Sequence, residues 1–256
     1  MYKRQDINGD SINSESLKKI GAIDLSTLPI VSNTTRLGAC VGNVGKFLCI
    51  GLNYSDHAKE SNMEVPKEPV IFSKITSSIC GPNDDVIIPR NAIKTDWEVE
   101  LGVVIGKSAK YVDEKDALDN VAGYCVINDL SEREYQLERS GQWIKGKSCD
   151  TFGPIGPWLV TPDEVGDTQN LDLWLDVDGM RYQDGNTRTM IFGVAYLIHY
   201  LSQYFTLQPG DVISTGTPHG VGLGQKPNPI YLRSGQKMHL GIEKLGVQNQ
   251  VTIDEI

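Results

Sequence analysis

The sequence predicts a mainly-β or α+β roll. Three observations support this class: many short apolar segments of strand length, one long helical segment, and frequent glycine and proline between the segments. Strands and helices do not alternate regularly along the chain, which disfavours a doubly wound sheet or a (β/α)₈ barrel. The 256 residues suffice for one large domain with a small appendage.

The chain divides into two parts. Residues 1–45 are polar at first and are then interrupted by Pro29 and several glycines, so we expect a small N-terminal segment or subdomain there. Residues 46–256 carry the strand pattern and form the expected main domain.

Strands are expected where short apolar runs end in turn residues. The expected strands are Phe47–Leu52, Val70–Ser73, Asp85–Ile88, Trp97–Gly106, Gly123–Leu130, Leu171–Val177, Asp211–Thr215 and Lys237–Glu243. The clearest alternation runs through residues 171–177, where four apolar side chains share one face. Asp178-Gly179 follows as a typical hairpin turn.

One long helix is expected at Met190–Phe205, with Thr187 or Thr189 as its N-cap. A short helix or lid is expected at Ser55–Ser61. The long helix is too short and too polar to span a membrane, and the polar N-terminus (Met1–Lys19) does not have the pattern of a secretory signal. The cytoplasm is therefore the expected location.

Composition limits the classes of ligand. The formal charge of −9, from 24 Lys and Arg against 33 Asp and Glu, disfavours general nucleic-acid binding. An anionic ligand would have to be held by a few local cations. The five cysteines are odd in number and form no CxxC pair, which disfavours a disulfide framework and a structural zinc site. Reduced, mostly buried thiols are expected instead.

An acidic pattern marks the strongest strand. Glu98 and Glu100 point to the same side because side chains alternate along a strand, and the next strand ends at a third carboxylate, Asp129. Three carboxylates on strand interiors or ends suit a hard cation with oxygen ligands. A polar, solvent-facing strand edge is the alternative, and the alternation alone leaves both interpretations open.

Further polar residues lie in loops beside these strands. His57 and Glu60 are three apart, which on a helical turn allows the carboxylate to orient the imidazole as a general base, or makes a simple exposed pair. Arg133 and Gln136 lie one turn apart after the second strand, and Lys147 precedes a rigid Gly-Pro segment. Lys147 could pair with a substrate carboxylate or be solvated like most lysines.

A glycine-rich loop follows the expected strand at residues 211–215. Its backbone amides and the Thr217 hydroxyl could hold a carboxylate. It is not a nucleotide-binding loop, because Pro227 and Pro229 prevent a helix from following directly.

Taken together, these segments resemble the fumarylacetoacetate hydrolase family. The resemblance rests on five motifs in the family's order, which cover about residues 46–245: Gly-Leu-Asn-Tyr-Ser-Asp-His (51–57), Trp-Glu-Val-Glu-Leu (97–101), Asn-Asp (128–129), Lys-Ser (147–148) and Gly-Thr-Pro-x-Gly-Val-Gly (216–222). The set is highly specific, although each motif alone is weak. Residues 1–45 lie outside it.

The resemblance implies a mixed β-roll, a homodimer or higher homo-oligomer, and Mg²⁺ or Mn²⁺ in the active site. The implied metal ligands are Glu98, Glu100 and Asp129. The implied catalytic residues are His57 and Glu60, as a dyad on a lid, and Lys147, which would contact substrate oxygens. Arg133, Gln136 and Thr217 would complete the site for a 2-oxo acid.

The family resemblance leaves several reactions open. The segment 145–160 resembles the branch that hydrolyses 2,4-diketo-3-deoxy sugar acids to pyruvate and a second acid. Ureidoglycolate lyase, oxaloacetate decarboxylase and hydratase or isomerase chemistry at the same site are alternatives, and a non-catalytic oxo-acid-binding protein is a third class. Arg188 stands where many relatives have a Ser-Asp pair, so it either binds substrate or is simply exposed.

Overall fold

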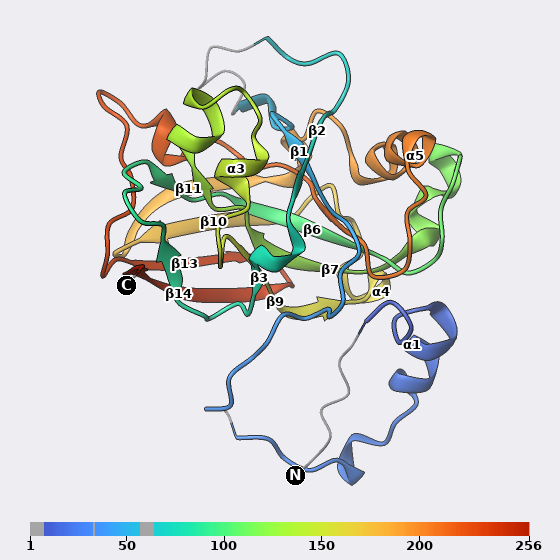
Figure 1. Cartoon of the computed structure of the whole chain (residues 1–256). Helices are drawn as coiled ribbons and strands as arrows, with labels where there is room; N and C mark the ends of the chain where they lie inside the picture. Colours follow the sequence, from blue (N-terminus) through green and yellow to red (C-terminus); the bar gives the residue numbers. More distant parts are fainter. Residues whose placement is uncertain (1–7, 33, 57–63, 256) are drawn as a thin grey trace.

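The computed structural model describes residues 8–32, 34–56 and 64–255. Two sheets make up most of the molecule (Figure 1). The larger sheet has seven strands in the order β2-β1-β12-β6-β7-β9-β3. These strands are β1 (Phe47–Gly51), β2 (Val70–Lys74), β3 (Ile79–Cys80), β6 (Val99–Ile105), β7 (Val121–Asn128), β9 (Gly153–Val160) and β12 (Val212–Ser214).

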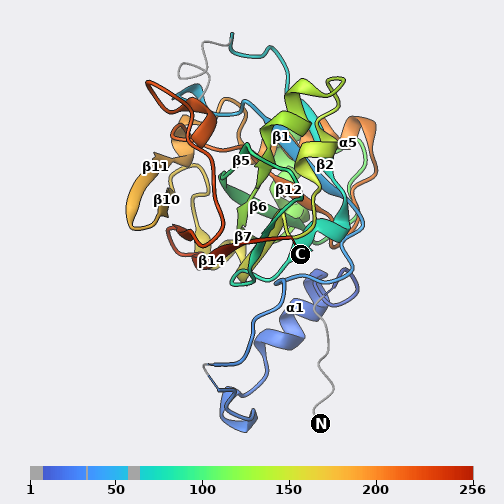
Figure 2. The same ribbon diagram turned by 60° about the vertical axis from the view of Figure 1, so that its left-hand side comes forward.

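The second sheet has five strands in the order β11-β10-β13-β14-β4. They are β4 (Val86–Ile88), β10 (Asp172–Val177), β11 (Met180–Asn186), β13 (Lys237–Ile242) and β14 (Gly246–Asp254). A two-stranded ladder pairs β5 (Thr95–Asp96) with β8 (Ser131–Glu132). In the view of Figure 2, β10 and β11 lie on one side of β6 and β7, and β1 and β2 lie on the other.

The main core lies between the two sheets. Leu101 of β6 and Val126 of β7 belong to one buried apolar cluster with Leu173 of β10 and Leu240 of β13. Residues 171–177 alternate as expected, with the four apolar side chains buried and the polar ones more exposed. The expected turn at Asp178-Gly179 is also confirmed, because both residues have positive φ, as a type I′ hairpin turn requires.

Helices are short and lie at the edges of the sheets. The α-helices are α1 (Ser14–Gly21), α3 (Ile144–Lys147), α4 (Pro162–Val165) and α5 (Val194–Tyr204). The other helical turns are η1 (Leu25–Thr27), η2 (Thr76–Ser78), η3 (Glu114–Asn120), η4 (Glu134–Glu138), η5 (Thr187–Thr189) and η6 (Gly222–Gly224). No helix in the described ranges is long and apolar enough to cross a membrane.

The long helix exists, but its expected start and cap are wrong. Helix α5 begins at Val194, after Gly193, without a side-chain cap. Thr187 and Thr189 instead belong to η5. Asn53 explains the difference, because its backbone carbonyl and side-chain oxygen accept hydrogen bonds from the N–H groups of residues 191 and 192, at 2.7 and 2.8 Å. These contacts occupy the segment before the helix.

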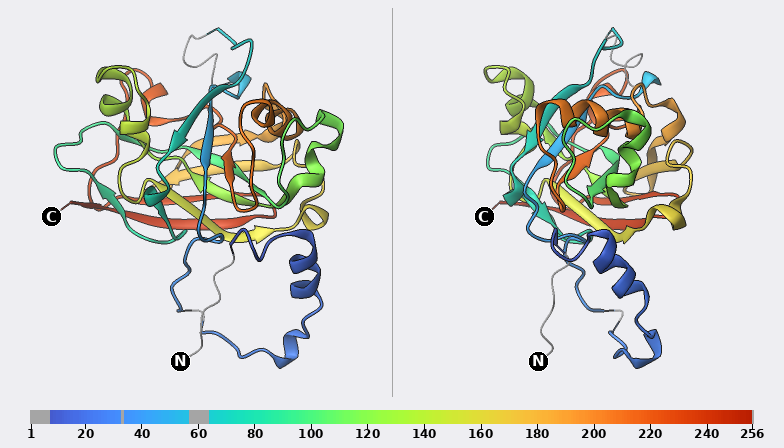
Figure 3. Two further views of the ribbon diagram at one scale, coloured as in Figure 1. Left: turned by 45° about the vertical axis from the view of Figure 1, so that its right-hand side comes forward. Right: turned by 90° about the vertical axis from the view of Figure 1, so that its right-hand side faces the viewer.

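The described part of the N-terminal segment, residues 8–45, projects from one side of the molecule (Figure 3, blue). Only its two ends join the core. Ile12 and Val41 are buried in a second apolar cluster, with Cys49 and Cys125 on the outer face of the larger sheet. Between these ends, Leu25 is 78% exposed. The division into an N-terminal segment and a catalytic domain from residue 46 stays a prediction.

The fold class is confirmed as mixed α+β and mostly sheet. All eight expected strands occur within a few residues of their expected bounds; the expected strand Trp97–Gly106 begins at Val99, as β6. The expected helix or lid at Ser55–Ser61 has helical geometry at its first two residues, and residues 57–63 lie outside the described part of the chain. All five cysteines are free, and two of them are buried.

Candidate active site

Antiparallel pairing of β6 with β7 brings three carboxylates together. Asp129 directly follows β7, and its N–H donates to the Glu98 carbonyl at 2.8 Å. Glu100 lies two residues beyond Glu98, on the same side of the chain. One carboxylate oxygen from each of the three residues lies within 4.8 Å of the other two. All three side chains are buried. We call Glu98, Glu100 and Asp129 the carboxylate cluster.

Two buried lysines balance part of this negative charge. Lys147 Nζ donates to Glu98 Oε2 at 2.7 Å and to Asp129 Oδ2 at 2.8 Å. Lys74 Nζ donates to Asp129 Oδ1 at 2.6 Å and to the carbonyl of Leu130 at 3.0 Å. Burial opposes the charged form of Lys147, but the charges of Asp129 and Glu98 outweigh it and raise its pKa. Lys147 therefore stays an ammonium at neutral pH.

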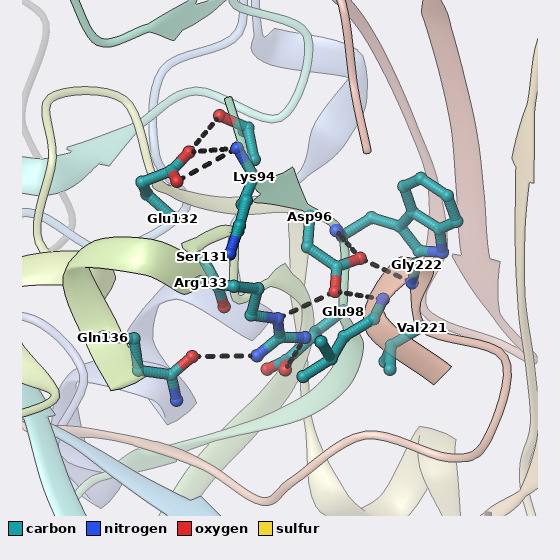
Figure 4. Close-up of polar contacts among 12 residues, drawn as sticks. Lys94, Asp96, Glu98, Ser131, Glu132, Arg133, Gln136, Val221 and Gly222 are labelled. Atoms are coloured by element: carbon teal, nitrogen blue, oxygen red, sulfur yellow. Dashed lines mark hydrogen bonds and ion pairs between the residues drawn. The ribbon is translucent and has the colours of Figure 1, made fainter. Parts of the chain in front are cut away.

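Arg133 links the carboxylate cluster to a fourth carboxylate (Figure 4). Its Nη2 lies 2.7 Å from Glu98 Oε1 and its Nε 2.8 Å from Asp96 Oδ2. Its Nη1 donates to Gln136 Oε1 at 3.0 Å, because η4 places Gln136 one turn further on. Burial opposes the charge of Arg133, but Asp96 and Glu98 raise its pKa, so it stays a cation.

Asp96 also anchors the glycine-rich loop. Its carboxylate accepts hydrogen bonds from the backbone N–H of Gly222 at 2.6 Å, of Leu223 at 2.9 Å and of Trp97 at 2.8 Å. Asp96 is fully buried. One side chain therefore fixes the position of both Arg133 and the loop that follows β12 (Figure 4).

Glu100 differs from its neighbours because it forms no ion pair with a cation among the described residues. Its Oε2 accepts from the Ser214 hydroxyl at 2.5 Å and from the N–H of Gly216 at 2.9 Å. Burial raises the pKa of Glu100, and the negative charges of Asp129 and Glu98 raise it further. A cation bound beside Glu100 would supply the missing counter-charge.

The donor set suits a hard divalent cation. Carboxylate oxygens are the preferred ligands of Mg²⁺ and Mn²⁺. Ligands about 2.1 Å from one ion are at most about 4.2 Å apart, so oxygens within 4.8 Å need only a small adjustment to share it. The unbalanced Glu100 is the second observation in favour of an ion. Glu98, Glu100 and Asp129 could therefore hold a divalent metal.

A cavity of about 150 Å³ opens onto the carboxylate cluster. Its polar lining consists of Glu98, Glu100, Arg133, Gln136, Lys147 and Thr217. The Thr217 hydroxyl donates to the carbonyl of Val99 at 2.9 Å and accepts from Gln183 Nε2 at 2.8 Å, which holds it in place. Asp129 lies behind Lys147 rather than in the lining.

The comparison with known families agrees with this arrangement. The sequence model described as the C-terminal domain of fumarylacetoacetate (FAA) hydrolase matches residues 46–252. The chain belongs to the fumarylacetoacetate hydrolase family. The match begins one residue after the N-terminal segment and spans both sheets and the cavity.

Relatives of several activities share this fold. A protein of Burkholderia lata, named as a hydrolase without a substrate, is 66% identical over 249 residues, which are 97% of this chain and 88% of the relative. The fumarylacetoacetate hydrolase of Exiguobacterium antarcticum is 36% identical with a TM-score of 0.84, over 91% of this chain and 83% of that one. A 2-hydroxyhepta-2,4-diene-1,7-dioate isomerase of Mycobacterium marinum is 37% identical with a TM-score of 0.72, over 83% of this chain and 75% of that one.

Most of the site residues predicted from the sequence lie close together in the structure. The three carboxylates, Lys147, Arg133, Gln136 and Thr217 lie at one cavity or directly behind it. Arg188 is exposed on η5 and is absent from the lining, so its binding role stays a prediction. His57 and Glu60 lie outside the described residues.

Sequence reasoning missed Lys74, Asp96 and Ser214. Lys74 ends an apolar strand 55 residues before its partner Asp129, so no spacing signals the contact. Asp96 lies two residues before Glu98 on the same stretch of chain. It could have been noticed as a further carboxylate beside Glu98 and Glu100. Ser214 lies within an expected strand, where a serine carries no signal of its own.

Proposed function

We propose that the protein is a divalent-metal-dependent hydrolase that cleaves a C–C bond in a 2,4-diketo acid, releasing pyruvate and a second acid. The observation that carries this proposal is the cavity in which three carboxylates that could hold a metal ion lie beside the buried cations Lys147 and Arg133. A 2,4-diketo-3-deoxy sugar acid is the substrate that the sequence resemblance favours.

Charge balance supports an anionic substrate. The network holds four carboxylates and three cations, which gives 3 − 4 = −1: Asp96, Glu98, Glu100 and Asp129 against Lys74, Arg133 and Lys147. A divalent ion would change this sum to +1. A positive cavity attracts the carboxylate of a 2-oxo acid.

The proposed reaction adds water across one C–C bond. Water attacks C4 of R–CO–CH₂–CO–COO⁻, the C3–C4 bond breaks, and C3 takes up a proton, which yields R–COO⁻ and pyruvate. Mg²⁺ or Mn²⁺ held by the carboxylate cluster would supply Lewis-acid stabilisation of negative charge on oxygen. Lys147 would donate a hydrogen bond to the substrate's oxo or carboxylate oxygen, and Arg133, Gln136 and Thr217 would orient the oxo-acid end.

We assign the proton transfer to His57, oriented by Glu60, on the basis of the family resemblance. An imidazole has an ordinary pKa near neutrality and can accept a proton from water when a carboxylate fixes its orientation. The proposal extends to a homodimer or higher homo-oligomer working in the cytoplasm, which light scattering and cell fractionation would test.

An isomerase is the second candidate, because several of the similar structures are named as isomerases, of which two illustrate the point. One is the Mycobacterium marinum protein described above. The other is a 5-carboxymethyl-2-hydroxymuconate Δ-isomerase of Mycobacterium smegmatis, 35% identical with a TM-score of 0.75 over 86% of this chain and 83% of that one. An isomerase would return a product of unchanged mass, whereas a hydrolase returns two acids.

The deciding experiment is turnover of acetylpyruvate and of a 2,4-diketo-3-deoxy sugar acid with Mg²⁺ or Mn²⁺, with products identified by mass. We expect pyruvate plus acetate or lactate from the wild type and at least a hundredfold lower rate from Glu98→Ala. Glu164→Ala, an exposed glutamate on α4, is the matched control and should keep the wild-type rate. Turnover of oxaloacetate or ureidoglycolate alone would keep the site and replace the reaction.

A further inference from the structure

The lining of the cavity combines charged and apolar side chains. Its charged lining residues, Glu98, Glu100, Arg133 and Lys147, all belong to the network around the carboxylate cluster. The rest of the described lining is mainly apolar and includes Ile50, Phe72, Leu137, Trp143, Val221 and Leu223. A substrate bound with its oxo-acid end at the carboxylate cluster would therefore place its other end against apolar side chains.

Trp143 and Phe72 form an aromatic part of the lining next to Lys147. Lys147 N donates to the carbonyl of Trp143 at 3.1 Å, so the two side chains lie one helical turn apart on the same side of α3. The Phe72 ring lies between them: its centroid is 5.1 Å from Lys147 Nζ and 5.2 Å from the Trp143 ring, which it meets edge to face at 61°. Ammonium, phenyl ring and indole thus make one continuous surface.

Gly51 fixes the indole against β1. A Cβ at Gly51 would lie 2.7 Å from the Trp143 ring, closer than any side chain tolerates. The indole therefore packs directly on the backbone of the strand, and it also meets the Phe72 ring edge to face. This packing restricts the position of Trp143 even though the residue is only half-buried.

The same two rings border a second hollow. A groove along β2 is lined by residues 70–73 and 141–144, and it shares only Phe72 and Trp143 with the lining of the cavity. Phe72 and Trp143 therefore lie where the cavity and this groove adjoin. Removal of the indole would join the two spaces and lengthen the room available beyond the carboxylate cluster.

We propose that Trp143 is a specificity-determining residue, and that the substrate class is 2-oxo acids with a short apolar terminus and no second carboxylate. The orientation of the substrate rests on the proposed function. The preference itself rests on desolvation. A carboxylate placed against the apolar side chains of the described lining, which offer it no cation, loses its hydration and gains no partner, whereas a methyl group loses nothing. Trp143 sets the length of the terminus that fits.

Binding of a chain-matched pair tests the preference without catalysis. Calorimetry with Mn²⁺ at neutral pH would compare the affinities for 2-oxohexanoate and 2-oxoadipate, which differ in a terminal carboxylate. We expect 2-oxohexanoate to bind at least tenfold more tightly. Equal affinity, or tighter binding of 2-oxoadipate, would overturn the apolar-terminus class.

Variants test the role of Trp143. In Trp143→Ala the ratio of affinities for 2-oxooctanoate over 2-oxobutyrate should rise at least tenfold relative to the wild type, and Trp143→Phe should give an intermediate ratio. Trp158→Ala is the matched control, since Trp158 is 54% exposed and does not line the cavity. An unchanged ratio in a folded Trp143→Phe and Trp143→Ala pair would refute the assignment.

Turnover separates this inference from the proposed function. Cleavage rates would be compared, as kcat/KM under the same conditions, between 2,4-dioxoheptanoate and 2,4-dioxoheptanedioate, and we expect the first to be cleaved at least tenfold more efficiently. If neither compound is cleaved while 2-oxohexanoate still binds more tightly than 2-oxoadipate, the hydrolase proposal fails and the apolar specificity stands. If both are cleaved equally well, the hydrolase proposal stands and the specificity fails.

Discussion

At the scale of single residues, Lys74 shows what holds the site together. Lys74 is buried, and its ammonium bonds to Asp129. Lys74→Met removes one partner of a buried ion pair, which we expect to lower the free energy of unfolding by about 3 kcal/mol or more. Added Mn²⁺ should reduce the loss, because a bound divalent ion supplies positive charge beside Asp129. Denaturant unfolding with and without Mn²⁺ measures both effects.

The control for this prediction is an exposed ion pair. Lys19 lies 2.7 Å from Glu15, with the side chains 74% and 78% exposed. Solvent screens such a pair, so Lys19→Met should change the free energy of unfolding by no more than about 0.5 kcal/mol. Equal losses in the two variants would contradict a structural role for the Lys74–Asp129 contact.

The thiol of Cys80 gives a prediction about pH. Burial, followed by the charge of Asp84, raises its pKa to about 12. At pH 8 the thiolate fraction of Cys80 is then about 0.01%, whereas a thiol with the ordinary pKa of 9.0 is about 10% thiolate. Because the thiolate is the form that reacts, alkylation in the folded protein should be about a thousandfold slower than in the unfolded chain. The rate should rise with pH until about pH 12. Iodoacetamide labelling followed by peptide mass spectrometry measures this, and equal labelling of folded and unfolded protein at pH 8 would exclude it.

At the scale of secondary-structure elements, Gly146 permits α3 to pack on η4. A Cβ at Gly146 would lie 2.4 Å from Gln136 N and from the Glu132 carbonyl oxygen, both backbone atoms. Gly146→Ala should therefore separate the two helices, lower the free energy of unfolding by about 1–3 kcal/mol and displace Lys147 from the cavity. We expect more than tenfold weaker binding of 2-oxohexanoate, measured by calorimetry.

Gly21→Ala is the corresponding control, because a Cβ there meets nothing within 4 Å. It removes a glycine from α1 without changing any contact at the cavity, so oxo-acid affinity should stay at the wild-type value. If Gly146→Ala also kept that affinity, the close approach of α3 and η4 would not be what positions Lys147.

The secondary-structure elements also show which parts of the site could be predicted from the sequence. The spacing of Glu98 and Glu100 and the position of Asp129 at a strand end indicated a possible metal site, because side-chain alternation is a local property, but they left a polar strand edge as the alternative. The role of Lys74 could not be predicted from the sequence, since its contact depends on strand pairing across the larger sheet. The N-cap of α5 was predicted wrongly for the same reason: the N–H groups of residues 191 and 192 donate hydrogen bonds to Asn53, far away in the chain, and these bonds occupy the segment before the helix.

At the scale of the whole molecule, the two sheets assemble one cavity from distant segments. Arg133, Gln136 and Lys147 come from connections beyond β7, whereas Thr217 follows β12 on the other side of β6. The order of strands in the sheet brings these segments together, and no spacing in the sequence encodes that order. The family motifs were the only sequence signal for it, which is why the site was predicted through resemblance rather than through pattern.

The N-terminal segment gives the last prediction at this scale. Ile12 is fully buried against the outer face of the larger sheet, whereas Leu25, in the middle of the segment, is 78% exposed. Ile12→Ala should lower the free energy of unfolding by about 2–4 kcal/mol, and Leu25→Ala, a truncation of the same size, by no more than about 0.5 kcal/mol. Urea unfolding of both variants measures the difference. A negligible effect of Ile12→Ala would mean that residues 8–45 do not unfold together with the two sheets, so that stability resides wholly in residues 46–256. A large effect would instead make the outer face of the larger sheet a shared core of both parts.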